Sequence, residues 1–178
     1  ASEVAYTKVL LEDLGAMDAT YSPTTSSTNN YGLAFETQQD MEIVDVTVYS
    51  ASATATDITV AVKDANSNEI LMEKVLSLPG GGSSASPVTV VLPLGFKVEP
   101  GQYRLLKTSG PALVRDYYSS SVGNPYPYAL GTSGAIVAGS YSTSSTSYYY
   151  NYFFDWTVVA TEVVCESVSE ASTVKLYV

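Results

Sequence analysis

The stretch at residues 147–159, SYYYNYFFDWTVV, decides which fold this chain can adopt, because seven of its thirteen residues are aromatic. Every second residue from Tyr148 continues an aromatic and apolar series: Tyr148, Tyr150, Tyr152, Phe154, Trp156 and Val158. Successive side chains of a strand point to opposite faces, so this period of two predicts one long β-strand with alternate rings turned inward. We expect Trp156 and Phe154 to anchor the core of the fold.

Further segments have the alternation of strands and are separated by turn residues. They are Met41–Ser50, with a slip at Val44-Asp45 that predicts a β-bulge, then residues 57–63, Ile70–Leu78, residues 88–94 and residues 102–107. Only residues 3–17 can be read as a helix, and a strand or linker fits them equally well.

Many short strands with frequent turn signals predict an all-β fold, an antiparallel β-sandwich of Ig-like or jelly-roll type. We expect residues 31–178 to form this sandwich. Residues 1–30 are expected to be an N-terminal strand, linker or arm that can contact another subunit. The sequence begins Ala1-Ser2, without an initiator Met, which indicates a mature product or a fragment of something longer.

The net charge and the fraction of charged residues indicate which partners the chain can bind and where it is located. The 178 residues carry 8 Lys+Arg against 18 Asp+Glu, a formal net charge of -10. Such an acidic surface repels phosphate backbones, so no nucleic-acid partner is expected. Charged residues are only 15% of the chain, and Tyr, Ser and Thr are abundant, which favours an extracellular or cell-surface location. No stretch reaches the roughly 20 apolar residues of a membrane helix, so no transmembrane segment is expected.

The sequence contains no His, which limits the catalytic and metal sites that the chain can form. Ser/His/Asp and Cys/His catalytic sets need an imidazole, and zinc sites usually do, so neither is expected. The carboxylate pairs that glycoside cleavage would use, Glu12/Asp13 or Asp155/Glu162, have no feature that separates them from surface acids. The single Cys165 is expected to be a buried small hydrophobe, although a link to another chain stays open. The sequence therefore predicts that the chain is not an enzyme.

Calcium is the one cofactor that the sequence leaves open. Asp64, Asn66 and Asn68 offer oxygen ligands at alternate positions, as the start of a calcium loop does. However, Glu69 stands where that loop needs Gly, and Val75 stands where it needs the bidentate acid. A hairpin turn is therefore the favoured interpretation. Asp13 with Asp18 is a second candidate pair.

Several segments resemble those of an Ig-like β-sandwich module that is repeated in large secreted and cell-surface proteins, adhesin-like ones among them, of Bacteroidetes-type bacteria. The most specific are NPYPYALGTSGAIVAGS at residues 124–140, the aromatic run ending in Asp155-Trp156, and Cys-Glu-Ser at residues 165–167 before a closing strand at residues 171–178. The module's pattern usually has an Arg two residues beyond Cys-Glu-Ser, where this chain has Ser169. The resemblance covers about residues 31–178. It implies a non-catalytic module for adhesion, display or spacing, and it names no ligand.

Two charged residues stand in apolar surroundings, Arg115 in ALVRDYY and Asp155 between Phe154 and Trp156. An isolated charge in such a setting is costly. We therefore expect Arg115 and Asp155 to form a bidentate ion pair with a structural role.

These observations together predict a non-catalytic extracellular module of a bacterial surface or secreted protein, serving adhesion, display or assembly. As a repeat unit or filament-type subunit, its partners would be other copies of itself or neighbouring repeats. The alternative is a carbohydrate-binding module that contacts surface glycans through four loop tyrosines, Tyr117, Tyr118, Tyr126 and Tyr128. The same rings can instead pack down and hold a long connection in place.

Overall fold

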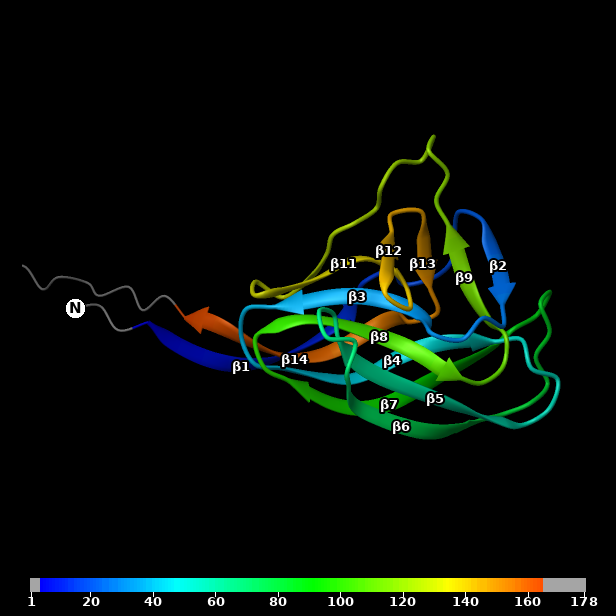
Figure 1. Ribbon diagram of the computed structural model, residues 1–178, viewed down its shortest axis with the longest axis horizontal. Coiled ribbons are helices and arrows are strands. Elements are labelled where there is room, and N and C mark those ends of the chain that lie inside the picture. The colour runs from blue at the N-terminus through cyan, green and yellow to red at the C-terminus, as the bar shows by residue number, and fades with distance from the viewer. Residues whose placement is uncertain (1–3, 165–178) are drawn as a thin grey trace, which may run out of the picture.

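The computed structural model describes residues 4–164, which form fourteen β-strands in two antiparallel sheets (Figure 1). Cys165, Ser169 and the closing strand expected at residues 171–178 lie outside the described residues. The two sheets are not closed into a barrel, so the predicted all-β antiparallel sandwich is confirmed.

Sheet A is built around β4 (Met41–Ser50). On one side of β4 lies β7 (Val88–Val98), and on the other lie β14 (Phe154–Val164) and then β1 (Ala5–Leu14). The end of β4 also meets β9 (Leu113–Tyr117), which is flanked by β13 (Tyr149–Asn151) and β2 (Pro23–Ser26). The register of β4 against β7 shifts between Ile43 and Asp45, so the predicted bulge is confirmed.

Sheet B has a simpler order. It runs β10 (Tyr128–Leu130), β11 (Gly134–Tyr141), β3 (Tyr31–Thr37), β8 (Gly101–Ser109), β5 (Thr56–Asp64) and β6 (Ile70–Leu78), with β12 (Ser144–Thr146) paired to β11. Sequence periodicity predicted β5, β6 and β8 and did not predict β3 and β11. It also missed the short strands β10 and β12, which have too few residues to show a period of two.

The core between the sheets is filled by the inward residues of each strand, as alternation requires. Trp156 is fully buried, its ring lies edge-on to Phe35 with centroids 5.6 Å apart, and its indole N–H donates to the Phe153 carbonyl at 2.8 Å. The N–H group, the one polar group of the indole ring, therefore has a partner inside the core. The prediction that Trp156 and Phe154 anchor the core is confirmed.

The prediction of one long strand at residues 148–158 is wrong. The chain turns between β13 and β14, where Tyr152 has a φ of 71° and the Phe153 N–H donates to the Asn151 carbonyl at 2.8 Å. This turn allows Tyr152, Phe153 and Phe154, three rings in succession, all to be buried. A straight strand would have placed the middle ring on the opposite face from its two neighbours.

The N-terminal segment belongs to the sandwich. Within residues 4–30, β1 pairs with β14, β2 pairs with β9, and Ala16 lies in the core. Of the three interpretations of this segment, the strand is the one the structure bears out for Ala5–Leu14. The boundary expected at residue 30 therefore does not separate two units.

Candidate functional site

The four loop tyrosines predicted to bind a ligand lie mostly inside the protein. Tyr118 is 1% exposed and Tyr126 is 8% exposed. The two hydroxyls of Tyr118 and Tyr128 share a hydrogen bond of 3.3 Å, and the Tyr126 hydroxyl donates to the Tyr149 carbonyl at 2.7 Å. Tyr118 and Tyr126 present no ring face to a ligand, so the ligand-binding prediction is wrong for these two. Tyr128 is half-buried, and Tyr117 stays 37% exposed.

The buried rings form one aromatic cluster with the centre of the long sequence run. Tyr126 stacks on Tyr150 with an interplanar angle of 6°, and Tyr128 meets Tyr150 edge-on. Burial raises the pKa of the phenol groups of Tyr118, Tyr126 and Tyr150, because an ionised ring would lose its hydration. These rings hold the long connection between β9 and β10 onto the core, which is the second of the two interpretations given above.

Arg115 finds an aromatic partner. Its guanidinium carbon lies 4.2 Å from the centroid of the Tyr149 ring, and Tyr149 in turn lies 4.9 Å from Tyr117. This geometry is a cation–π contact between neighbouring strands β9 and β13.

Asp155 lies in an acidic neighbourhood. Its pKa is raised by burial first, and then by the negative charges of Asp13, Asp45 and Glu12. The predicted ion pair between Arg115 and Asp155 is therefore wrong. Arg115 lies on β9 opposite Asn151, whereas the chain has already turned at Tyr152 before Asp155 enters β14.

The proposed calcium loop is a hairpin turn between β5 and β6. One oxygen of the Asp64 carboxylate accepts the N–H groups of Asn66 and Ser67, both at 2.8 Å, and these bonds lower the pKa of Asp64. Asn68 takes a φ of 60°, as the turn requires. The favoured hairpin interpretation is confirmed, and calcium binding at Asp64, Asn66 and Asn68 stays a prediction. Among residues 4–164 no group of three His, Cys, Asp or Glu side chains is placed to hold a metal.

The candidate catalytic carboxylates Asp155 and Glu162 are not a pair. They lie seven positions apart on β14, roughly 20 Å along a strand and on opposite faces of it. Carboxylate pairs for glycoside cleavage lie about 5 to 10 Å apart. The Glu162 carboxylate instead stabilises the β10–β11 turn, because it accepts hydrogen bonds from the Thr132 amide and hydroxyl.

A buried lysine that sequence reasoning missed joins two loops. Lys107 is 0% exposed, and its ammonium group donates to the carbonyls of Ser27 at 3.0 Å and Pro111 at 2.9 Å. The face of the Tyr152 ring lies 5.3 Å from the nitrogen. Burial lowers the pKa of Lys107 to about 8. The signal in the sequence was a lone Lys at an apolar strand end, in YRLLK.

Two more buried charges act in the same way. The Arg104 guanidinium donates to the Ser140 hydroxyl at 2.7 Å and to the Ser144 carbonyl at 2.9 Å, which fixes the β11–β12 turn. The carboxylate of Asp116, fully buried, accepts three backbone N–H groups, those of Thr20, Tyr21 and Ser22. Lys107, Arg104 and Asp116, which we call the loop-holding charges, all have a structural role.

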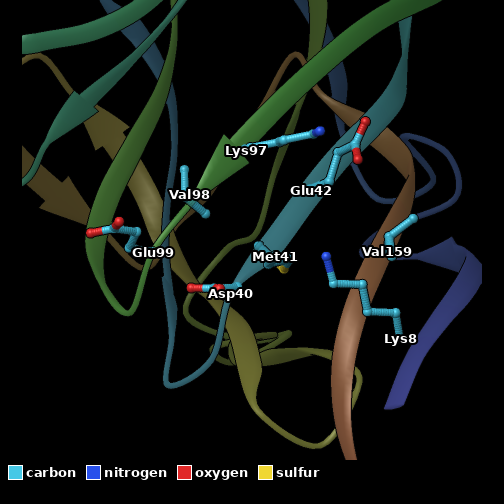
Figure 2. Close-up of a pocket in the computed structure, with 8 residues that line it drawn as sticks. All are labelled: Lys8, Asp40, Met41, Glu42, Lys97, Val98, Glu99 and Val159. Carbon is cyan, nitrogen blue, oxygen red and sulfur yellow. The ribbon is translucent and has the colours of Figure 1, made fainter. Parts of the chain in front are cut away.

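The surface also carries a groove of about 330 Å³ where β1, β14, β4 and β7 come together (Figure 2). Its lining mixes both signs of charge with apolar groups: Lys8, Asp40, Met41, Glu42, Lys97, Val98, Glu99 and Val159. Figure 2 shows the Lys97 side chain reaching toward Glu42, its partner in the strand register. The groove contains neither a nucleophile with a base nor a set of metal ligands, so it offers a place for polar contact and no evident chemistry.

Neither a protein-family model nor a curated protein matches this chain. Its class is therefore the one its fold defines, an all-β sandwich protein, and the resemblance to bacterial Ig-like modules stays a prediction. No helix that could cross a bilayer is present in the part of the chain that the structure describes.

Proposed function

We propose that this chain is a non-catalytic extracellular β-sandwich module of a bacterial surface or secreted protein, serving adhesion, display or assembly. The proposal rests on one observation: the loop-holding charges Lys107, Arg104 and Asp116 are buried and hydrogen-bonded to loops. A catalytic site keeps its perturbed ionisable groups in a cleft and free to react. Here the buried charges are hydrogen-bonded to loop backbone, which supports a rigid body that acts through its surface.

The placement of the first and last described strands supports display from one end. Ala5 of β1 lies opposite Val164 of β14, and Figure 1 shows both strands extending together from one end of the sandwich, which we call the attachment pole. Any polypeptide joined to either strand would hold the module at this pole. The loops that Lys107 fixes lie away from it, because β8 runs from the attachment pole toward Ser109 (Figure 1).

Surface display on a non-adherent bacterium tests this function. The full chain is anchored through its N-terminus, and attachment of the cells to one another and to abiotic and host surfaces is measured under flow. An unrelated sandwich domain of similar size, displayed at the same density, is the control. We expect more attachment than with the control domain. Attachment equal to the control, at matched display and with the chain folded, would contradict the proposal.

Carbohydrate binding remains the second candidate because of one specific observation. Tyr117 is 37% exposed and its ring lies 4.9 Å from the Tyr149 ring that carries the Arg115 guanidinium, and Tyr148, the residue before Tyr149, is 51% exposed. Exposed rings beside a cation suit an acidic sugar. Binding of the purified chain to a glycan array, lost in Tyr117→Ala and kept in Tyr21→Ala, would favour this function over the first. Tyr21 is also an exposed ring, 58% exposed, outside this set.

A further inference from the structure

The two arginines of the chain, Arg104 and Arg115, differ in what their guanidinium groups bind. Each buries its Nε without a partner, but the terminal nitrogens differ. Those of Arg104 donate to the Ser140 hydroxyl at 2.7 Å and to the Thr143 carbonyl at 3.2 Å. Those of Arg115 form no hydrogen bond or ion pair with any of residues 4–164. Because a structural arginine normally binds acceptors through these N–H groups, Arg115 has donors left for a ligand.

The nearest neighbours of Arg115 do not neutralise its charge. Asp116 follows it on β9, so its side chain points to the opposite face of the strand. The Asp116 carboxylate is fully buried there and accepts three backbone N–H groups of residues 20–22. Asn151, directly opposite Arg115 in the register of β9 and β13, is a neutral amide. The cation therefore stands without an anion from either strand neighbour.

Arg115 lies beside a row of tyrosine rings that joins the two sheets. Tyr31 of β3 lies 4.5 Å from Tyr141 of β11 between ring centroids, and Tyr141 lies 6.1 Å from Tyr149 of β13. Tyr149 lies 4.9 Å from Tyr117 of β9 and carries the Arg115 guanidinium on its ring. Figure 1 shows β11, β13 and β9 along one side of the molecule. We call these four rings the tyrosine row, and Tyr117 is the most exposed of them.

The charge of Arg115 acts on the tyrosine row. Burial raises the pKa of the Tyr141 hydroxyl, and the positive charge of Arg115 acts in the opposite direction. The site thus combines a cation that has free donors with exposed aromatic surface. A planar carboxylate matches the fork of N–H groups of a single guanidinium. An aromatic ring suits the flat C–H face of a pyranose, so the two features together fit a sugar that bears a carboxylate.

From this arrangement we infer that Arg115 and the tyrosine row bind a carboxylate-bearing sugar residue of an acidic glycan, with the carboxylate on Arg115 and the sugar ring against Tyr117. The inference rests on the proposed adhesive function and its carbohydrate-binding candidate, and it names the ligand class and the residue that sets specificity. The net charge of -10 disfavours anions over the surface as a whole. An acidic glycan is therefore directed to this cation, since charges farther than about 8 Å are screened at physiological ionic strength.

Isothermal titration of the purified full chain with acidic oligosaccharides tests the inference. The probes are oligogalacturonate, oligoguluronate, hyaluronan oligosaccharides and sialyllactose. Each probe is paired with its methyl ester, which keeps the sugar ring and removes the charge. We expect binding of at least one acid, with affinity roughly tenfold lower for its ester, because hydrogen bonds to a charged group are lost. This comparison uses the wild type, so it stands whether or not a variant folds.

Three variants locate the site. Arg115→Gln should lower the affinity for the acid by roughly tenfold and bring it close to the affinity for the ester. Tyr117→Ala should weaken the binding of acid and ester alike, because it removes the stacking face. Lys97→Gln on β7 is the matched control. It makes the same change in net charge at an exposed cation outside the tyrosine row and should leave both affinities unchanged.

The inference would be overturned if no acidic probe bound, if the esters bound as tightly as the acids, or if Lys97→Gln weakened binding as much as Arg115→Gln. Binding of triglutamate as tight as that of the best acidic sugar would also overturn it and assign the site to acidic peptides. Displaying cells that attach although the purified chain binds none of the probes would refute the glycan ligand alone. Binding by the purified chain without attachment of the cells would refute the adhesive function alone.

Discussion

The ammonium nitrogen of Lys107 lies over the ring of Tyr152, 5.3 Å from its centroid, inside a protein that exposes none of either side chain. Lys107 comes from β8 of sheet B, and Tyr152 comes from the turn that leads into β14 of sheet A. The Tyr152 hydroxyl donates to the Thr28 carbonyl at 3.0 Å, next to Ser27, which accepts from Lys107. One lysine and one tyrosine thus connect both sheets to the loop before β3.

Replacing Lys107 by Met should destabilise the protein by about 3 kcal/mol, because buried carbonyls lose their donor and each unsatisfied group costs about 1 to 3 kcal/mol. Urea unfolding measures the change. Lys97→Met, at an exposed lysine, is the control and should change stability by less than about 0.5 kcal/mol. A loss from Lys107→Met no larger than this would show that the carbonyls of Ser27 and Pro111 find other donors.

The sequence YRLLK shows a lysine in an apolar setting, but it does not show which distant carbonyls bind the Lys107 ammonium group. The turn at Tyr152 and the partner of Arg115 were missed for similar reasons. Residues 152–154 are all aromatic, so they satisfy either strand parity, and periodicity alone cannot reveal the turn that buries all three. Arg115 needed a partner, as expected, but the sequence does not say that a ring from β13 supplies it. The alternating strands β4 and β5 were predictable because local pattern fixes them.

Asp155→Asn should stabilise the protein at neutral pH. Burial and the acids Asp13, Asp45 and Glu12 raise the pKa of Asp155 in the folded state above its unfolded value of 3.8. The folded state therefore binds this proton more tightly, so stability is fully present below pH 3.8 and falls as the pH rises through the folded pKa. Asn cannot ionise and also accepts the positive φ of 45° at this position.

Thermal unfolding of wild type and Asp155→Asn at a series of pH values checks this. The variant should have a higher melting temperature than the wild type at pH 7, and the difference between the two melting temperatures should disappear below pH 3.8. Asp57→Asn is the control at an exposed acid on β5, and its melting temperature should stay close to that of the wild type. An Asp155→Asn variant less stable than wild type at pH 7 would show that the carboxylate makes a favourable contact in the folded state.

The buried tyrosines should make the fold fail at high pH. Burial raises the pKa of Tyr118, Tyr126 and Tyr150 above the ordinary value of 10.0. Because the folded pKa lies above the unfolded one, the stability contribution is complete below pH 10 and is lost as the pH rises further. Absorbance of phenolate should therefore appear in two stages, first from exposed rings and then abruptly with unfolding.

Circular dichroism recorded through the same titration identifies the second stage. The abrupt rise in phenolate should coincide with loss of β structure, and in urea all 15 tyrosines should titrate together near pH 10. A single smooth titration near pH 10 of the folded protein would mean that the Tyr118, Tyr126 and Tyr150 rings reach solvent without unfolding.

The attachment pole predicts how the module responds to force. Ala5 and Val164 lie opposite one another in antiparallel strands, and hydrogen bonds in such a pair run perpendicular to the strands. Force applied between residues 5 and 164 therefore opens one bond pair after another, whereas force between residue 5 and Ala85, in the loop before β7, loads the β1–β14 bonds together. Single-molecule pulling on Cys165→Ser variants with cysteine handles at these positions should give an unfolding force several-fold lower for the first geometry. Equal forces in the two geometries would instead favour a spacer that carries tension along the chain. Low resistance to force between residues 5 and 164 suits a module that is displayed from the attachment pole and loaded through its other surfaces.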